Sequence, residues 1–404
     1  MSWRESSAMD ERLRFVQDVH RPGWSIAELC RRYAVSRKTG YKWLARYAAA
    51  GPAGLVDGSH RPGTCPHETP TAVIGLILQL QQRYTWGARK VRRLLLDRLA
   101  VDQVPTKTTV HRILERYGRV RPRRASRRRF HAGRPGTPMD EPNAVWTADF
   151  KGQFRTGDGV YCYPLPVQDG ASRYLLGCRG LLEPTTAGSW REFARLFRRY
   201  GLPERIRSDN GAPFASHALG RLSTLSVWWV RLGIRPELIE PAHPEQNGRH
   251  ERMHRTLKAA TARPPQADLA AQQRRFEAFR VEFNTVRPHE GLHDATPASC
   301  YAPSPRPYAR TLAPVEYPGH FERRLVSRNG GIRWNSQWVN VSHLLAELEV
   351  GFEEIDDGLW DVYFGPVWLG RFHEAVGRIV DRVDRSERRS GGNHKGGPKV
   401  LPIS

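Results

Sequence analysis

Cysteine and acidic residues are scarce in this sequence, and a long apolar run is missing. The cysteines are scattered, odd in number and without a Cys-x-x-Cys pair, which favours a reducing cytosol over a disulfide framework. No stretch of about eighteen apolar residues offers a bilayer span. The N-terminus is charged rather than signal-like, so the expected location is the cytoplasm. The five cysteines are Cys30, Cys65, Cys162, Cys178 and Cys300.

The shortage of acids leaves the chain strongly basic. Lys and Arg number 64 against 41 Asp and Glu, which gives a formal net charge of +23 and a pI near 10.5. A chain this basic is expected to bind a polyanion, and nucleic acid is favoured over a membrane surface. At 404 residues the chain is long enough for roughly two to four domains.

Residues 9–47 have the apolar spacing of helices. Ser25 with Glu28 forms a capping box, and Ser36 is placed to cap the next helix. The short turn between these helices resembles a helix-turn-helix, in which the start of the second helix meets base edges. The alternative is an ordinary helical hairpin with a solvated basic face. The residues expected to contact DNA here are Arg37, Lys38 and Lys42.

A second helical segment and a basic run follow a linker rich in Gly and Pro. Residues 71–84 and 106–117 have helical spacing, and the latter resembles another recognition helix. Residues 119–134 contain eight arginines and no acid, so this run is expected to stay extended until it meets phosphates. A solvated basic linker is an equally acceptable interpretation. The arginines expected to bind DNA are Arg127, Arg128 and Arg129.

Two aspartates each end a short apolar run. Asp149 closes the run 145–149, and Asp209 closes the run 204–209 ahead of Asn-Gly. An Asp at the end of a strand, where the chain opens into a loop, is where open α/β sheets place ligand chemistry.

A third acid is predicted on a helix. Residues 241–248 are rich in turn formers and precede a run of good helix formers that contains Glu251. One carboxylate among cations on one helical face suits a metal ion beside a phosphate. A solvated helix held by pairing of Glu251 with Arg255 is the alternative. The basic residues expected on that face, and expected to orient phosphates, are His254, Arg255 and Lys258.

Four ordered motifs resemble those of the DDE transposase and retroviral integrase superfamily, and most closely those of bacterial insertion-sequence transposases. They are WTADF at 146–150, RSDNGAPF at 207–214, HPEQNGRHERMHRTLK at 243–258, and FNTVRPHEGL at 283–292 with Thr296-Pro297. The resemblance implies that Asp149, Asp209 and Glu251 are the catalytic and metal-binding triad.

The spacing of the third acid departs from a common pattern in the superfamily. An interval of about 35 residues after Asp209 ends at Glu245, which lies in the turn. Glu251 is preferred because it lies inside the predicted helix and is followed by a basic and a bulky residue. The longer interval is expected to be taken up by a longer helix over 222–232. Glu245 stays the minor candidate.

The resemblance and the local patterns together predict a multidomain fold. N-terminal all-α helix-turn-helix modules precede a central α/β ribonuclease-H-like core, and short alternating runs after Pro305 predict a small C-terminal β-barrel. The histidines and cysteines lack the paired spacing of an integrase-type zinc module, so no structural zinc is expected. The expected boundaries are 1–55 and 56–118 for the two helical modules, 119–142 for the arginine-rich linker, 143–305 for the core, 306–385 for the barrel and 386–404 for a disordered tail.

The activity implied by the resemblance is DNA transposition. Two Mg²⁺ ions, with Mn²⁺ as a substitute, would be held by the three acids while a transposon end is cut and its 3′-hydroxyl attacks target DNA. The implied partners are double-stranded DNA at the transposon ends and the target, at least one further copy of the chain, and an accessory ATPase, at the bacterial nucleoid and not at a membrane. The alternatives are a ribonuclease-H-like DNA nuclease and a sequence-specific DNA-binding regulator with an inactive core.

Overall fold

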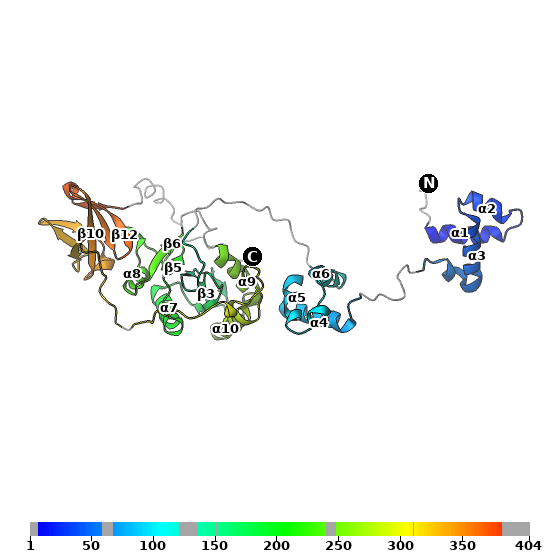
Figure 1. The fold of residues 1–404 in the computed structure, drawn as a ribbon, viewed down its shortest axis with the longest axis horizontal. Helices are drawn as coiled ribbons and strands as arrows, with labels where there is room; N and C mark the ends of the chain where they lie inside the picture. Colours follow the sequence, from blue (N-terminus) through cyan, green and yellow to red (C-terminus); the bar gives the residue numbers. More distant parts are fainter. Residues whose placement is uncertain are drawn as a thin grey trace. The chain divides into compact units, whose positions relative to one another are not determined.

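The computed structural model describes residues 7–58, 68–120, 136–150, 152–239, 248–309 and 311–381. The chain divides into two compact units, one ending at Ile74 and the other beginning at Gly75. The first unit is helical, and the second continues through a helical segment, a sheet flanked by helices and a C-terminal β region (Figure 1). Three predictions concern residues outside the described ranges: Arg127, Arg128 and Arg129 as DNA contacts, Glu245 as the minor candidate, and the tail 386–404.

The first unit is built from three capped helices. Phe15, Leu29 and Trp43, one from each helix, meet in its buried core. The capping box of Ser25 and Glu28 is confirmed, and Ser36 accepts a hydrogen bond from the Thr39 amide as predicted. The helices are α1 (Ala8–Val19), α2 (Ile26–Arg32) and α3 (Arg37–Ala50).

A second set of three helices opens the second unit. The helical spacing predicted for 71–84 and 106–117 is confirmed, and the Thr106 side chain caps the last helix by accepting from the Thr109 amide. Val91, Leu95 and Val110 are fully buried here. The helices are α4 (Thr71–Tyr84), α5 (Ala88–Leu96) and α6 (Lys107–Arg116).

The central sheet is mixed, as expected for an α/β core. Its order is β2-β3-β1-β5-β6, with β4 also paired to β3. β1 runs parallel to β5 and antiparallel to β3, and β5 runs parallel to β6. The strands are β1 (Val145–Ala148), β2 (Phe154–Arg155), β3 (Tyr161–Asp169), β4 (Leu175–Leu181), β5 (Arg205–Ser208) and β6 (Arg235–Leu238).

Helices cover both faces of this sheet. Leu176 packs in a core with Phe193 of α7 and Trp229 of α8. Its neighbour Leu175 packs in another core, with Met253 of α9 and Phe276 of α10. Because adjacent strand residues point to opposite faces, α7 and α8 cover one face and α9 and α10 the other. The helices are α7 (Thr186–Tyr200), α8 (Thr224–Arg231), α9 (Gly248–Thr261) and α10 (Leu269–Thr285).

Strand β1 breaks off at its aspartate and resumes as β2. Both strands pair antiparallel with β3, and their registers differ by one residue. β1 and β2 thus pair with the same side of β3, with an irregularity of one residue in register between them. Such irregularities re-aim side chains and are frequent beside active sites.

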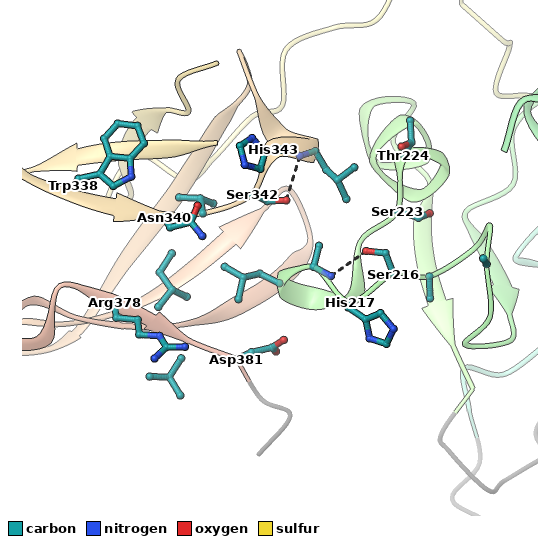
Figure 2. A pocket seen from close by; sticks show the side chains of 18 of the residues that line it. Ser216, His217, Ser223, Thr224, Trp338, Asn340, Ser342, His343, Arg378 and Asp381 are labelled. Carbon is teal, nitrogen blue, oxygen red and sulfur yellow. Dashed lines mark hydrogen bonds between the residues drawn. The ribbon is translucent and has the colours of Figure 1, made fainter. Parts of the chain in front are cut away.

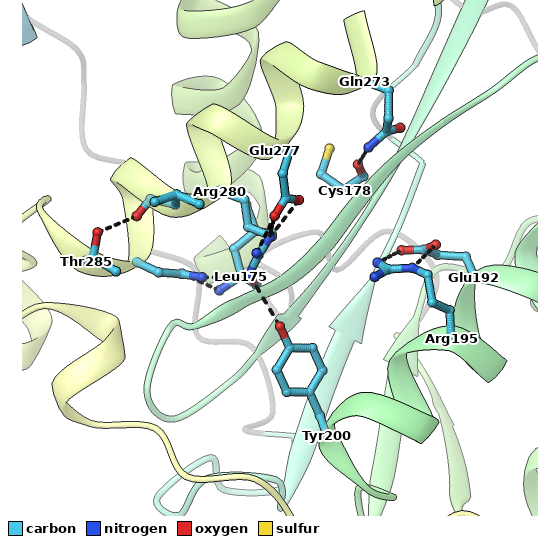
Figure 3. A network of polar contacts seen from close by, with 11 residues as sticks. Leu175, Cys178, Glu192, Arg195, Tyr200, Gln273, Glu277, Arg280 and Thr285 are labelled. Carbon is cyan, nitrogen blue, oxygen red and sulfur yellow. Dashed lines mark hydrogen bonds and ion pairs between the residues drawn. The ribbon is translucent and has the colours of Figure 1, made fainter. Parts of the chain in front are cut away.

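The outer edge of β4 is covered by amide side chains of α10 (Figure 3). Asn284 accepts from the Leu175 amide at 2.8 Å and donates to the Leu175 carbonyl at 2.9 Å. Further along β4, Gln273 accepts from the Gly180 amide and donates to the Cys178 carbonyl, both at 2.9 Å. These pairs satisfy backbone groups that a free sheet edge would expose. Asn284, a residue of the FNTVRPHEGL motif, thus has a structural role at the edge of the sheet.

Helix α8 is shorter than the sequence predicted. The helix predicted over 222–232 is present over Thr224–Arg231, two residues shorter at its start and one at its end. Gly220 and Arg221 have left-handed backbone angles (φ 62° and 56°) that interrupt a helix, and Ser223 caps α8 by a capping box.

The C-terminal β region shares its core with α8. Val227 and Val230 of α8 belong to the same buried cluster as Phe352 and Phe364. Five strands form one sheet in the order β13-β12-β11-β10-β7, and β8 pairs with β9 in a second. The strands are β7 (Glu322–Leu325), β8 (Gly331–Trp334), β9 (Gln337–Asn340), β10 (Glu349–Asp356), β11 (Leu359–Phe364), β12 (Val367–His373) and β13 (Arg378–Val380).

Close packing at Gly40 gives a test of the first unit. A Cβ at this position would lie 2.6 Å from Cys30 Sγ and 3.0 Å from Phe15 Cζ. Gly40→Ala is expected to destabilise the unit locally by about 1–3 kcal/mol through overpacking. Amide hydrogen exchange in α1 to α3 measures this loss.

Two further variants control that experiment. Cys30→Ala combined with Gly40→Ala removes the closest atom and is expected to restore part of the protection. Gly75→Ala, in α4 where nothing lies within 4 Å of the added Cβ, is expected to raise protection slightly because alanine is the better helix former. Unchanged protection in Gly40→Ala would contradict the packing described.

Candidate active site

Asp149 and Asp209 follow two neighbouring parallel strands in matching register. Trp146 pairs with Ile206 and Thr147 with Arg207, so two residues further along Asp149 comes opposite Asp209. Adjacent strands lie about 4.8 Å apart. The sheet therefore brings together two of the three acids that the sequence singled out.

The two carboxylates are directed to the α9 face of the sheet. Trp146, Ala148 and Ile206 are buried in the core under α7 and α8. Residues of opposite parity, including the two aspartates where the strands continue, therefore point to the other face. Both aspartates are half-buried.

Asp209 lies in a loop that is shaped by hydrogen bonds. Its Oδ1 accepts from the Gly211 amide at 3.3 Å. Burial raises the pKa of the Asp209 carboxyl above its ordinary value, and the Gly211 hydrogen bond opposes that rise. Asn210 donates to the Ile239 carbonyl at 2.7 Å and accepts from Arg221 at 3.2 Å. Asn210 thus fixes the course of the loop, which agrees with the structural reading of the Asp-Asn-Gly sequence.

Helix α9 is anchored to β1 by two buried histidines. His250 Nδ1 and Thr147 Oγ1 form a hydrogen bond of 2.8 Å. One turn later, His254 Nδ1 lies 4.0 Å from Asp149 Oδ2, and the two histidine rings meet edge-on with centroids 4.3 Å apart. The sequence analysis overlooked His250, although its i, i+4 spacing from His254 on an otherwise polar helix was a usable signal.

Glu251 lies on the exposed flank of α9. The buried face of the helix contains His250, Met253 and His254, and Glu251 follows about 100° further round the helix axis. Its side chain is 66% exposed, and its carboxylate lies 3.9 Å from the Arg255 guanidinium. The pairing considered as an alternative is therefore present. Arg255 is exposed and Lys258 half-buried, whereas the predicted phosphate contact His254 is buried against Asp149.

The donor chemistry of these acids suits a hard divalent cation, but the full ligand set is not assembled. Carboxylate oxygens are the ligands that Mg²⁺ and Mn²⁺ prefer. Within the described ranges, no group of three His, Cys, Asp or Glu side chains is close enough to hold a metal ion. Asp149 and Asp209 offer carboxylate oxygens of this kind at the ends of adjacent strands, and the Glu251 carboxylate lies near Arg255.

A large cavity lies between the loop that follows Asp209 and the C-terminal β region (Figure 2). Its volume is about 1390 Å³, and its walls come from the loop after Asp209 and from the C-terminal β region. One wall begins at Ala212, and Trp338 and Arg378 line the opposite side. Trp338 is half-exposed, so the cavity offers an aromatic face and a cation next to the loop that follows the second acid.

The predicted DNA contacts of the first helix-turn-helix lie on its surface. Arg37, Lys38 and Lys42 are all exposed on the first turns of α3. The Lys42 ammonium also lies 5.0 Å from the centroid of the Trp43 ring. Their position at the start of the second helix of the motif agrees with base-edge readout.

Family models match four stretches of the chain. Two models described as Integrase core domain match residues 139–244 and 232–297. A Helix-turn-helix domain model matches residues 11–63, and a Homeodomain-like domain model matches residues 39–114. The chain therefore carries an integrase core domain preceded by helix-turn-helix domains. These matches agree with the resemblance that the sequence motifs indicated.

Relatives of the chain include insertion-element proteins. It is 25% identical over 307 residues to an uncharacterized 39.2 kDa protein of insertion element IS476 from Xanthomonas euvesicatoria, covering 74% of this chain and 84% of that protein. It is 28% identical over 172 residues to the uncharacterized protein K02A2.6 of Caenorhabditis elegans, covering 41% of this chain. The match spans only 12% of the length of the nematode protein.

Solved structures with some similarity come from retroviruses. One is a simian T-cell lymphotropic virus intasome in complex with PP2A regulatory subunit B56 gamma, with 14% identity, TM-score 0.36, and coverage of 76% of this chain and 100% of that one. Another is the HTLV-2 integrase catalytic core domain in complex with magnesium, with 15% identity, TM-score 0.32, and coverage of 40% and 97%.

The raised pKa of Asp209 predicts that replacing its carboxylate by a neutral side chain increases the stability of the fold, by an amount that depends on pH. A carboxyl whose pKa is raised by folding stabilises the fold below its ordinary pKa of about 3.9, and that stabilisation is lost as the pH rises through the raised value. Asp209→Asn is therefore expected to unfold at a higher temperature than the wild type at pH 7 in chelator. The gain should shrink as the pH falls through the raised pKa and be lost below about 4.

Asp158→Asn is the matched control, for which the opposite change in unfolding temperature is expected. Hydrogen bonds from Thr156 and Val160 lower the pKa of Asp158, so its neutralisation should lower the unfolding temperature at pH 7. Thermal unfolding of both variants across this pH range measures the difference. A lower unfolding temperature for Asp209→Asn at pH 7 would contradict the burial argument.

Proposed function

We propose that this chain is a DDE transposase that binds the ends of its element and catalyses metal-dependent DNA strand cleavage and strand transfer. The observation that carries the proposal is the register of β1 and β5, which sets Asp149 beside Asp209 on the face covered by α9. Helix-turn-helix domains ahead of an integrase core support DNA as the substrate.

Asp149, Asp209 and Glu251 would hold the metal, with Mg²⁺ as the expected ion and Mn²⁺ as a substitute. When bound, two divalent cations supply a deprotonated water or 3′-hydroxyl as nucleophile and stabilise the charge on the leaving oxygen. The half-buried carboxylates of the two aspartates set the position of the site. His254 restrains Asp149 from the helix side, at 4.0 Å, and the cations of α9 are available to phosphates.

In the proposed site, Glu251 joins the two aspartates only after DNA has bound. Its carboxylate is exposed and lies near Arg255, and an incoming phosphate is the natural competitor for that guanidinium. DNA binding would then take Arg255 and free Glu251 to join the aspartates. This order makes the metal site complete only when the substrate is present.

The DNA-binding parts and partners follow from the same proposal. Arg37, Lys38 and Lys42 of α3 would read the element ends, and Arg255 and Lys258 would contact backbone phosphates. The C-terminal sheets would act as a small barrel that flanks the DNA, with the cavity at Trp338 facing it. Joining two ends requires at least a dimer, and an accessory ATPase and a place at the bacterial nucleoid go with this type of transposition. Among the described helices, none is long and apolar enough to cross a membrane.

Strand transfer with Mg²⁺ tests the proposal and the choice of the third acid together. The substrate is the DNA that flanks the chain's own gene. Glu251→Gln is expected to lose joined products by at least about a hundredfold, because a metal ligand contributes several kcal/mol to the transition state. Glu245→Gln is the matched control and should keep them. Binding of the same DNA should be retained in both.

The other outcomes point to the rival functions. Cleavage without joining would identify a ribonuclease-H-like nuclease. Specific binding with no chemistry in any divalent metal would identify a regulator with an inactive core. Loss of joining in Glu245→Gln but not in Glu251→Gln would reassign the third acid.

A further inference from the structure

Three arginines gather where the β3–β4 turn meets the start of α9. Arg173 lies in the turn, and Arg249 and Arg252 lie in the first two turns of the helix. Burial, together with the charges of Arg249 and Arg252, lowers the pKa of Arg173 to about 10. The Arg173 guanidinium is thus close enough to Arg249 and Arg252 to be repelled by their charges. We refer to Arg173, Arg249 and Arg252 as the arginine cluster.

The cluster is held in place by the surrounding backbone. Arg173 has a left-handed backbone angle (φ 62°), and its carbonyl accepts from Gln168 Nε2 at 2.8 Å. A Cβ at Gly291 would lie 3.2 Å from Arg173 Nη2, so only a glycine leaves easy room for this guanidinium. Arg249 Nη1 donates to the Gly170 carbonyl at 2.9 Å. Arg173 and Arg249 are therefore fixed on the same turn.

The positive charge of the cluster is not balanced by the acids beside it. Among the described residues, Arg173 Nε is buried and has no hydrogen-bond partner. The acids that flank Gly291 are already engaged by another arginine. Arg89 Nε donates to both oxygens of Asp294 at 3.0 Å, and Arg89 also pairs with Glu290. Gathering like charges with incomplete pairing costs free energy, which a bound anion would recover.

The cluster lies on the other side of α9 from the proposed catalytic acid. At about 100° per residue, Glu251, Arg255 and Lys258 fall on one side of the buried face of the helix. Arg249 and Arg252 fall on the other side. The positive end of the α9 dipole adds to the same region. An anion bound here is thus distinct from the phosphate at the aspartates.

We propose that the arginine cluster binds a backbone phosphate of double-stranded DNA, so that the duplex is held on both flanks of α9. This inference rests on the proposed function only in taking DNA as the substrate. The guanidinium groups supply charge-assisted hydrogen bonds to the phosphate oxygens. Because such contacts carry no sequence information, the cluster positions the duplex rather than choosing its sequence.

The salt dependence of DNA binding tests the cluster in the full-length chain. Arg173→Gln is compared with Arg179→Gln, an exposed arginine on β4 that removes the same charge from the same sheet. The probe is a duplex from the flank of the chain's own gene. Arg173→Gln should weaken binding about tenfold and reduce the slope of log affinity against log salt by about one. Arg179→Gln should leave the slope unchanged.

A folding readout separates this role from a structural one. Without DNA, Arg173→Gln should unfold at the same temperature as the wild type or above it, because it relieves repulsion. Arg252→Gln, at an exposed position, is a second variant that should reduce the slope in the same way. An unchanged salt slope in both variants, or a slope reduced equally by Arg179→Gln, would overturn the proposal.

These outcomes are independent of strand transfer. If the wild type binds DNA but never joins strands, the proposed transposase activity is rejected. The phosphate site is then decided by the salt slopes alone. If the wild type joins strands but Arg173→Gln keeps the full salt slope, the proposed function stands and the phosphate site is rejected.

Discussion

Parallel pairing of β1 with β5 is the constraint on which the rest of this molecule depends. A parallel pair needs a crossover, and here the crossover includes β3, β4 and α7. Its result is that two residues 60 positions apart reach the same end of the sheet in register. Since Ile206 and Trp146 are both fully buried, a slip of either strand by one residue would turn its aspartate into the core under α7 and α8. Burial thus protects the register that places the carboxylates together.

Helix α9 is tied to this pair by polar contacts instead of extensive apolar packing. His250 holds to Thr147 and His254 lies against Asp149, while Met253 and Leu257 supply the buried apolar contacts. Cations lie on both sides of that buried face, and Glu251 is exposed. Such a helix can keep its position over the sheet while its exposed side chains exchange partners. That property suits a site whose third ligand and phosphate contacts are completed by the substrate.

Local signals in the sequence predicted a large part of this fold. The caps at Ser25 and Ser36 are confirmed because a capping side chain bonds within three residues of itself. The strand that ends just before Asp149 follows from a short apolar run bounded by polar residues. Helix α8 begins two residues later than predicted, because Ser223 serves as its N-cap.

Long-range contacts set the limit on what the sequence could reveal. Asn284 forms hydrogen bonds with the backbone of Leu175, 109 positions away in the sequence. No local sequence pattern predicts that pairing. The arginine cluster likewise joins a hairpin turn to a helix start that lies far along the chain. Motif order singled out the three acids, yet only the folded chain shows that Asp149 and Asp209 follow neighbouring strands in matching register and that Glu251 lies near Arg255.

The most direct measurement is the position of Mn²⁺, located by anomalous scattering in crystals of the protein bound to its DNA end. The account predicts Mn²⁺ in contact with the carboxylates of both Asp149 and Asp209, with Glu251 turned away from Arg255 toward them. Mn²⁺ bound to only one of the two aspartates, or held at a different place on the sheet, would contradict it.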